Sequence, residues 1–338
     1  MGLSTSAAVA RLDVGRETGQ IIGFWEGLLA GLRKRQGLGR LWQEVKRFEP
    51  DLVILVGYPG VNLFLGKRCR RAGVRVIYLA PPQVWAWGRF RVKLLQAAAD
   101  RVICLFGFEE QFLRKCGLNA VYYGYPLLDQ VVLSSSRAET LRRIGFNPQT
   151  EYIAFLPGSR SSEINYHKLL FVEVFKRLKS RYPELKGVMV GDGEGELSEG
   201  LHWSKEKGRY DVIGHSRAAV VVSGTATAET AILGVPMVVC YHLSPLSYFL
   251  ARLLVRVRYF SIPNLCADEP VVPEFIRARV GDIFYAVCRL IDDDVYRRQV
   301  IAGLEMVKSL LGPDGAIDKI AQEVLGLNQQ AGKDRAQM

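Results

Sequence analysis

The stretch VVVSGTATAETAILGVPMVVCY, from Val220 to Tyr241, contains two apolar runs separated by a turn of small residues and a short helical segment. Both runs are short and rich in β-branched residues, which is typical of strands buried on both faces of a parallel sheet. A strand, a helix and a second strand in this order form one βαβ unit. The stretch therefore predicts an α/β fold with a parallel sheet.

Further runs of the same kind occur along most of the chain. Each is bounded by Gly, Pro or Asp, and most are separated by stretches of helical periodicity such as Leu169–Tyr182. This alternation of strands and helices predicts a doubly wound α/β architecture. The expected strands are Asp51–Tyr58, Val74–Ala80, Asp100–Phe106, Tyr152–Gly158, Gly187–Asp192, Ala218–Gly224 and Val235–Tyr241.

A change of pattern between Asp129 and Thr150 indicates a boundary between two domains. Ser134–Ser136 and Asn147-Pro148 mark loops on either side of a short polar helix, so we place an interdomain linker here. A cleft between two Rossmann-like domains is the expected ligand site. The expected division is residues 1–135 for the first Rossmann-like domain, 136–325 for the second and 326–338 for a polar tail.

The composition is that of a globular protein with an acidic partner. The chain has 338 residues, 49% hydrophobic and 23% charged, so it can bury a large core, and its length favours about two domains. A formal net charge of +11 calls for an acidic partner, which could be nucleic acid, anionic lipid or a phosphorylated small molecule. Charge alone does not choose among these three.

The cysteines and the apolar runs indicate a cytosolic protein without membrane-spanning helices. The cysteines contain no C-x-x-C pair, which favours reduced thiols over a disulfide framework or a zinc site. No apolar run reaches the roughly 18 to 20 uncharged residues needed to cross a bilayer. The six cysteines are Cys69, Cys104, Cys116, Cys240, Cys266 and Cys288.

The turn inside the opening stretch has the composition of a phosphate-binding turn. Residues that follow a strand of an α/β sheet lie at its carboxyl edge, and the next helix points its N-terminus at them. Ser223, Gly224 and Thr225 would offer backbone N–H groups and two hydroxyls to an anion there. Glu229, one turn into the helix, could accept hydrogen bonds from vicinal sugar hydroxyls. The alternative is an ordinary N-cap turn with a favourable first-turn charge.

A second turn of this type occurs in LPGSRSSEI, Leu156 to Ile164. Gly158 permits the turn, Ser159 offers a hydroxyl, and Arg160 is placed where it can bind nucleotide phosphates bidentately. The alternative for Arg160 is a surface ion pair with Glu163. Two anion-binding turns on one sheet edge predict a nucleotide site in the second half of the chain.

A series of sequence blocks extends this prediction to a family. Over roughly Ile21 to Leu325 the chain resembles the lipid-A-disaccharide synthases, which are inverting glycosyltransferases of the GT-B fold. The resemblance implies two Rossmann-like domains facing a cleft. The blocks are PPQVWAWGRFRV (Pro81–Val92), FGFEEQF (Phe106–Phe112), GYPLLD (Gly124–Asp129), LPGSR (Leu156–Arg160), SGTATAE (Ser223–Glu229), YFSIPNL (Tyr259–Leu265) and VVPEFI (Val271–Ile276).

The resemblance implies the reaction and its substrates. The C-terminal half would hold UDP-2,3-diacylglucosamine, and the N-terminal half would hold 2,3-diacylglucosamine 1-phosphate, whose 6-hydroxyl attacks the anomeric carbon with loss of UDP. We expect neither a cofactor nor a metal, so Arg160 and the amides and hydroxyls of Ser223 and Thr225 would meet the charge on the leaving phosphate. Glu229 then resembles the ribose ligand.

Two further site residues rest on the resemblance. Asn264 and Glu274 would contact the donor sugar or its phosphates. Their alternative roles are a turn asparagine after Pro263 and a helix-start glutamate after Pro273.

The chain also departs from the family pattern. The family has a further N-terminal strand with a glycine-rich turn, so we expect the first domain to lack its first strand. After the strand at 51–58 the family has Asp-x-Pro-Asp, including a carboxylate that serves as base, whereas this chain has Tyr58–Val61 and no acid. Gly124–Pro126 reads Gly-Tyr-Pro for Gly-His-Pro, and Arg277 replaces a Gln. The general base is therefore unknown, and we assign it to none of the titratable candidates His167, His215 and His242.

The acylated substrates imply contact with an anionic membrane surface. Residues 244–260 place apolar side chains at helical spacing beside Arg252, Arg256 and Arg258, and residues 23–42 add tryptophans beside a basic cluster. The alternative for residues 244–260 is a core helix with solvated arginines. The implied location is the cytoplasm, peripheral on the inner face of the bacterial cytoplasmic membrane. We expect no nucleic-acid partner and leave a homodimer open.

Two other functions remain open at this point. One is a catalytically weak or inactive UDP-sugar-binding relative of the synthases. The other is a GT-B transferase or nucleotide-sugar epimerase that uses a different acceptor.

Overall fold

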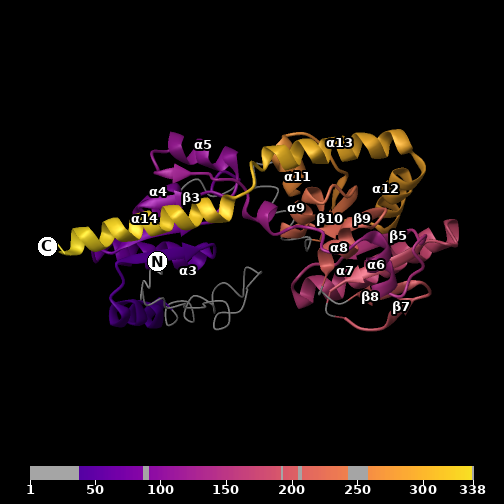
Figure 1. Ribbon diagram of the computed structural model, residues 1–338, viewed down its shortest axis with the longest axis horizontal. Coiled ribbons are helices and arrows are strands. Elements are labelled where there is room, and N and C mark those ends of the chain that lie inside the picture. The colour runs from indigo at the N-terminus through magenta and orange to yellow at the C-terminus, as the bar shows by residue number, and fades with distance from the viewer. Residues whose placement is uncertain (1–37, 87–90, 192, 205–207, 243–257, 337–338) are drawn as a thin grey trace, which may run out of the picture. The chain divides into compact units, whose positions relative to one another are not determined.

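A computed structural model describes residues 38–86, 91–191, 193–204, 208–242 and 258–336 (Figure 1). Within these ranges the chain forms two compact units. The first unit contains the residues up to Tyr123 together with those from Asp318 onward, and the second contains Gly124–Ile317. The chain therefore leaves the first unit once and returns to it with its last helix.

The first unit is built on a four-stranded parallel sheet with the order β1-β2-β3-β4. Helices connect the successive strands, as parallel pairing requires. The main core includes Leu55, Val76, Tyr78 and Leu95. The elements are a helix over residues 38–48, β1 (Leu52–Val56), α3 (Pro59–Arg71), β2 (Arg75–Leu79), α4 (Arg91–Ala98), β3 (Arg101–Ile103), α5 (Gly107–Lys115) and β4 (Ala120–Val121).

The last helix, α14 (Ala316–Ala336), packs on the sheet of the first unit, where it is drawn in yellow in Figure 1. Apolar side chains of α14 cover the buried residues Ile77, Ile103 and Val121; they are Ile320, Val324 and Leu327. Arg101 of β3 also pairs with Glu323 of α14 at 2.6 Å. The structure thus differs from the expected division, because residues 326–336 continue helix α14 instead of forming a separate tail.

The second unit is built on a seven-stranded sheet with the order β11-β10-β9-β5-β6-β8-β7, in which only the β7–β8 pair is antiparallel. Its strands are β5 (Tyr152–Leu156), β6 (Lys186–Val190), β7 (Glu196–Ser198), β8 (Leu201–Ser204), β9 (Ala218–Val222), β10 (Met237–Tyr241) and β11 (Glu274–Ile276). Its helices are η1 (Pro126–Asp129), α6 (Arg137–Arg143), α7 (Ser161–Arg181), α8 (Arg209–Gly214), α9 (Thr225–Ile232), α11 (Ile262–Ala267), α12 (Val280–Asp292) and α13 (Asp294–Leu310).

The central strands β5 and β9 explain why the sequence shows continuous apolar runs. Every residue of both strands is buried. Helix α7 contributes Phe171 and Phe175 to the same interior, and their rings lie 5.6 and 6.0 Å from the ring of Phe155. A strand covered on both faces has no solvated side, so its residues are apolar without alternation.

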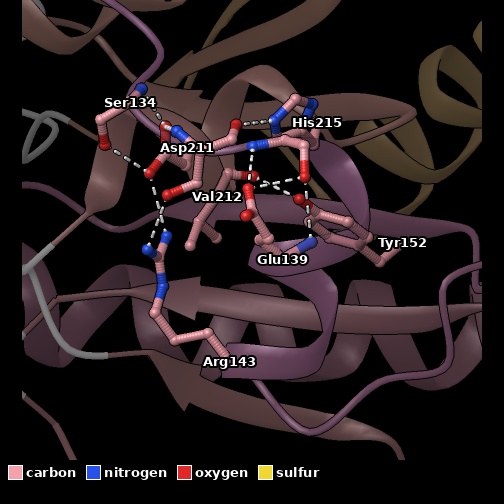
Figure 2. Close-up of polar contacts among 9 residues, drawn as sticks. Ser134, Glu139, Arg143, Tyr152, Asp211, Val212 and His215 are labelled. Atoms are coloured by element: carbon pink, nitrogen blue, oxygen red, sulfur yellow. Dashed lines mark hydrogen bonds and ion pairs between the residues drawn. The ribbon is translucent and has the colours of Figure 1, made fainter.

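The serine run at the expected linker is anchored to the second unit (Figure 2). Asp211 of α8 is 1% exposed and accepts hydrogen bonds from the backbone N–H and hydroxyl of Ser134 at 2.7 and 2.8 Å. The N–H of Ser135 and the guanidinium of Arg143 complete the set at 3.1 and 3.0 Å. The boundary of the compact units accordingly lies at Tyr123, twelve residues before the expected position at 135.

Candidate functional site

The two expected anion-binding turns begin side by side. Strands β5 and β9 are paired in parallel, with Leu156 opposite Val221. The turn at 157–160 follows β5 and the turn at 223–225 follows β9. Both turns therefore open at the carboxyl edge of one sheet, where ligands of open α/β sheets bind.

The turn after β5 is shaped by Gly158 and Arg160. Gly158 has φ +109°, and a Cβ at this position would lie 2.8 Å from the Glu163 carboxylate. Arg160 is the extended N-cap residue of α7, and its guanidinium pairs with the carboxylate of Glu163. The Arg160 side chain is still 41% exposed. The ion pair with Glu163, which was the alternative role of Arg160, is thus present in the structure.

The turn after β9 presents the N-terminus of α9. Gly224 has φ +156° and ψ −162°, and no atom lies within 4 Å of the position of a Cβ. Thr225 begins the helix and is exposed. The Ser223 hydroxyl donates to the carbonyl of Phe260 at 3.0 Å, so it is engaged within the protein. The first N–H groups and the dipole of α9 remain the features of this turn that suit an anion.

Glu229 lies inside the second unit rather than on its surface. It is 6% exposed, its carboxylate pairs with Arg209 of α8, and it accepts a hydrogen bond from the Tyr210 hydroxyl at 3.3 Å. Arg209 and Tyr210 were absent from the sequence-based set. No periodicity or spacing links them to Glu229, because the contact is made between two separate helices.

Asn264 and Glu274 meet each other. The Asn264 amide donates to the Glu274 carboxylate at 3.0 Å and to the carbonyl of Val272 at 2.9 Å. The Glu274 carboxylate also accepts from the backbone N–H groups of Phe260 and Ser261 at 3.1 and 3.0 Å. The Glu274 carboxylate thus holds the segment at 260–261, and Asn264 is bonded to that carboxylate. The turn after β9 is bonded to the same segment through Phe260.

The turn after β1 contains no carboxylate. Tyr58 adopts φ 41° and ψ 63° before α3, and Pro59 is the first helical residue. Asn62 closes the turn by donating to the carbonyls of Val56 and Gly57 at 3.2 and 2.9 Å. The Asn62 amide is thus engaged by the backbone of its own turn, and no acidic side chain occurs from Gly57 to Asn62.

A buried acid follows β3 instead. Glu109 is 2% exposed, and its carboxylate accepts hydrogen bonds from the Trp85 indole at 2.9 Å and from the N–H groups of Leu105 and Phe106 at 3.1 and 3.3 Å. Burial raises the pKa of Glu109 to about 7. The signal in the sequence was a glutamate three residues after Phe106, the spacing of a capping box.

The candidate histidines have different surroundings. Nδ1 of His167 lies 2.8 Å from the carbonyl of Glu163, and burial lowers the pKa of His167. The ring of His242 stacks on Tyr166 with centroids 3.6 Å apart. Nε2 of His215 lies 2.9 Å from the carbonyl oxygen of Ser135, so His215 contacts the anchored serine run (Figure 2).

Several expectations concern residues that lie largely outside the described ranges. These are the amphipathic stretch at 244–260, of which 258–260 are described, and the tryptophan-containing stretch at 23–42, of which 38–42 are described. Among the described helices, none is both long and apolar enough to cross a bilayer.

The described residues also contain no group of three or more His, Cys, Asp or Glu side chains arranged to hold a metal ion.

Solved structures with the same fold are UDP-sugar enzymes. The S. aureus MnaA–UDP co-structure has a TM-score of 0.63 at 14% identity, over 91% of this chain and 83% of that chain. The UDP-GlcNAc 2-epimerase from Neisseria meningitidis, bound to UDP-GlcNAc, has a TM-score of 0.59 at 12% identity, over 90% and 83%. The fold is thus the α/β GT-B architecture, with two Rossmann-like domains.

Sequence comparisons assign the family within this architecture. A model of the lipid-A-disaccharide synthetase family matches residues 14–287. The lipid-A-disaccharide synthase of Geobacter sulfurreducens is 38% identical over 287 residues, which are 82% of this chain and 75% of the relative. That of Myxococcus xanthus is 35% identical over 318 residues, or 91% and 83%. The chain belongs to the lipid-A-disaccharide synthetase family.

Proposed function

We propose that the chain is a hexosyltransferase of lipid A biosynthesis. It transfers 2,3-diacylglucosamine from UDP to the 6-hydroxyl of 2,3-diacylglucosamine 1-phosphate and releases UDP. Family membership supports the reaction. The structural observation that carries the proposal is the pairing of β5 with β9, because it brings the Arg160 turn and the N-terminus of α9 to one edge of the sheet.

The second unit is assigned to the donor and the first to the acceptor. As the acceptor oxygen bonds to the anomeric carbon, the bond from that carbon to the β-phosphate oxygen breaks and negative charge grows on UDP. The Arg160 guanidinium and the first N–H groups of α9 lie at neighbouring strand ends and would stabilise this charge. Glu163 keeps the guanidinium beside the turn.

The other site residues of the second unit are proposed to bind the ribose or to shape the donor site. Glu229, oriented by Arg209 and Tyr210, is proposed as the ribose contact. Asn264 and Glu274 are proposed to shape the donor site by holding the backbone at 260–261 beside the turn after β9. Gly158 and Gly224 would let the backbone approach the diphosphate closely, and Ser159 would offer its hydroxyl.

The ribose assignment is tested with UDP and 2′,3′-dideoxy-UDP. The unmodified chain should bind UDP roughly tenfold more tightly, because two hydrogen bonds are lost with the hydroxyls. Glu229→Gln should reduce this ratio while binding the dideoxy compound normally. An undiminished ratio in the variant would remove Glu229 from the ribose site.

One observation favours a second candidate, a UDP-sugar-binding relative with weak catalysis. The turn at Tyr58–Gly60 lacks the carboxylate that the family pattern places after β1. Incubation of the purified chain with labelled UDP-2,3-diacylglucosamine and the acceptor separates the two. Formation of labelled disaccharide 1-phosphate supports the transferase, and UDP binding without product supports the binding protein.

We also propose peripheral attachment to the inner face of the cytoplasmic membrane. The net charge of +11 and the arginine-rich apolar sequence at 244–260 support it. Co-sedimentation with phosphatidylglycerol vesicles should exceed that with phosphatidylcholine vesicles and fall as salt rises. Equal binding to both would contradict an electrostatic attachment. A homodimer, the other proposed association, is tested by sedimentation velocity.

A further inference from the structure

Aromatic side chains from two neighbouring strand ends lie together in the first unit. Strands β2 and β3 are paired, with Leu79 opposite Ile103. Trp85 follows β2, and Phe108 lies in the first turn of α5, after β3. Their ring centroids are 4.8 Å apart with an interplanar angle of 86°, and both residues are partly exposed. The pair is therefore accessible near the carboxyl edge of the sheet, where α/β proteins bind ligands.

The carboxylate of Glu109 holds the pair in one arrangement. It accepts the indole N–H of Trp85 while its second oxygen accepts the N–H groups that precede α5. A buried carboxylate is costly unless such donors compensate it, so the bonds specify the position of the indole. The polar edge of Trp85 is thus satisfied inside the protein, so its hydrocarbon surface is what it can offer to a ligand. The Phe108 ring is stacked on Phe106, with centroids 5.3 Å apart, so one of its two faces is covered.

The backbone that leads to Trp85 is strained. Ala80, directly after β2, has φ +54°, which non-glycine residues rarely adopt. Its N–H donates to the carbonyl of Ile103 at 3.1 Å, and Val84 beyond it is fully buried. Strained backbone of this kind persists only where the surroundings over-determine it, and it is concentrated at functional sites. The loop is therefore built to keep Trp85 in place.

We propose that Trp85 and Phe108 form an aromatic shelf that binds an acyl chain of the glycolipid acceptor. The inference rests on the proposed function, which gives the first unit an acylated acceptor. Ring faces without a free polar group favour hydrocarbon over a phosphate or a nucleotide, because the gain comes from removing apolar surface from water. The shelf lies at the carboxyl edge, so a chain seated there belongs to a substrate at the ligand edge of this unit.

Fluorescence quenching tests the contact directly in the full-length chain. The probe is 2,3-diacylglucosamine 1-phosphate with bromine atoms in its acyl chains, since bromine quenches indole fluorescence only at short range. The chain has five tryptophans, so each variant removes one emitter. Trp85→Phe should lose most of the quenching. The control is Trp42→Phe, which changes a partly buried tryptophan in the core of the first unit and should keep the quenching. Unchanged quenching in Trp85→Phe would overturn the proposal.

The second measurement varies the length of the acyl chains on the acceptor. Phe108→Ala and Trp85→Phe should weaken binding of the long-chain acceptor by roughly 5- to 20-fold, as expected for the loss of buried apolar contact. An acceptor with acetyl groups in place of the long chains should bind equally to all variants. A loss that is the same for both acceptors would indicate a contact to the sugar and overturn the shelf.

UDP binding separates this inference from the proposed function. The shelf variants should bind UDP with unchanged affinity, because the pyrophosphate turns belong to the other unit. If the unmodified chain fails to bind UDP, the proposed function fails. If UDP binds and the acyl-chain dependence is absent, only the aromatic shelf fails. Circular dichroism and urea unfolding confirm that each variant is folded.

Discussion

The carboxylate of Glu163 pairs with the guanidinium of Arg160 across the first turn of α7 and lies against Gly158. Glu163 therefore has two contacts in the turn after β5, one with Gly158 and one with Arg160. It leaves no room for a side chain at 158, and it holds the arginine at the carboxyl edge of the sheet. The Arg160 side chain as a whole remains 41% exposed at this edge.

Arg160→Ala should abolish disaccharide formation, with a loss of at least about 100-fold in kcat, because a preorganised cation at the leaving group is removed. Unfolding stability should change by less than about 1 kcal/mol, since the pair is partly exposed. Arg177→Ala, an exposed arginine on the same helix, is the matched control and should retain full activity. Near-normal turnover of Arg160→Ala would remove the phosphate clamp.

Glu163→Gln should increase the affinity for UDP by about threefold, because Arg160 then gives its full charge to the diphosphate. Isothermal titration calorimetry of the variant and the unmodified chain measures this difference. The double variant Arg160→Ala/Glu163→Gln should lose the increase. A gain that persists without Arg160 would show that Glu163 acts by general repulsion of the anion.

Asp211→Asn should destabilise the second unit by about 2 to 4 kcal/mol, because the anchored serine run and Arg143 lose a buried charged acceptor. Burial by itself raises the pKa of Asp211, but the hydrogen bonds from Ser134, Arg143 and Ser135 outweigh it and lower the pKa to about 2. The folded-state pKa is depressed, so this contribution is present above about pH 4 and is lost as the pH falls towards 2.

Urea unfolding from pH 3 to 7 measures the Asp211 effect. The difference between the unmodified chain and Asp211→Asn should shrink by about 1 kcal/mol between pH 7 and pH 3. Asp314→Asn, at an exposed position, should show no such trend. A difference that is constant across this range would contradict the charged anchor.

The contribution of Glu109 to the free energy of unfolding should change with pH in the direction opposite to that of Asp211. Its pKa is raised from 4.5 to about 7, so the folded state holds the proton more tightly than the unfolded state. The contribution of Glu109 is largest below about pH 4.5 and declines by roughly 3 kcal/mol as the pH rises through 7. Glu109→Gln cannot ionise and should remove this decline.

The measurement is the difference in unfolding free energy between the unmodified chain and Glu109→Gln at pH 5, 6, 7 and 8. The variant should be most destabilising at pH 5 and progressively less so at higher pH. Glu110→Gln is the neighbouring control, because Glu110 forms a more exposed pair with Arg114. Parallel pH profiles for both glutamine variants would argue against a raised pKa at Glu109.

A strand occurs at each of the seven expected places, as β1, β2, β3, β5, β6, β9 and β10, but the bounds differ: β3, for example, is Arg101–Ile103 where 100–106 was expected. Strands β2, β3, β5, β6, β9 and β10 are mostly buried and need unbroken apolar sequence, which is visible in the residues themselves. Strand β1 has the same apolar pattern although Ile54 and Val56 are exposed. The short strands β4, β7, β8 and β11 were not predicted. They contain two to four residues, too few to show a period, and they exist because a neighbouring strand offers backbone partners.

The candidate site divides in the same way. The turns at 157–160 and 223–225 were recognisable because each combines a strand end with glycine, hydroxyl or arginine in a local run. The partners of Glu229, Asp211 and Glu109 were not recognisable, because each pair joins residues at least 24 positions apart or on separate elements. Sequence spacing carries no information on such contacts.

The sequence by itself determined the α/β class, the two anion-binding turns and the family blocks, because strand burial and turn chemistry depend on residues close together along the chain. Tertiary structure alone decided that Ile320, Val324 and Leu327 cover the first sheet and that Ser134 belongs to the second unit. The sequence of an apolar helix face shows that the face will be buried, but it does not show which surface it will pack against. That choice is made by shape and by the buried charges that long-range packing brings together.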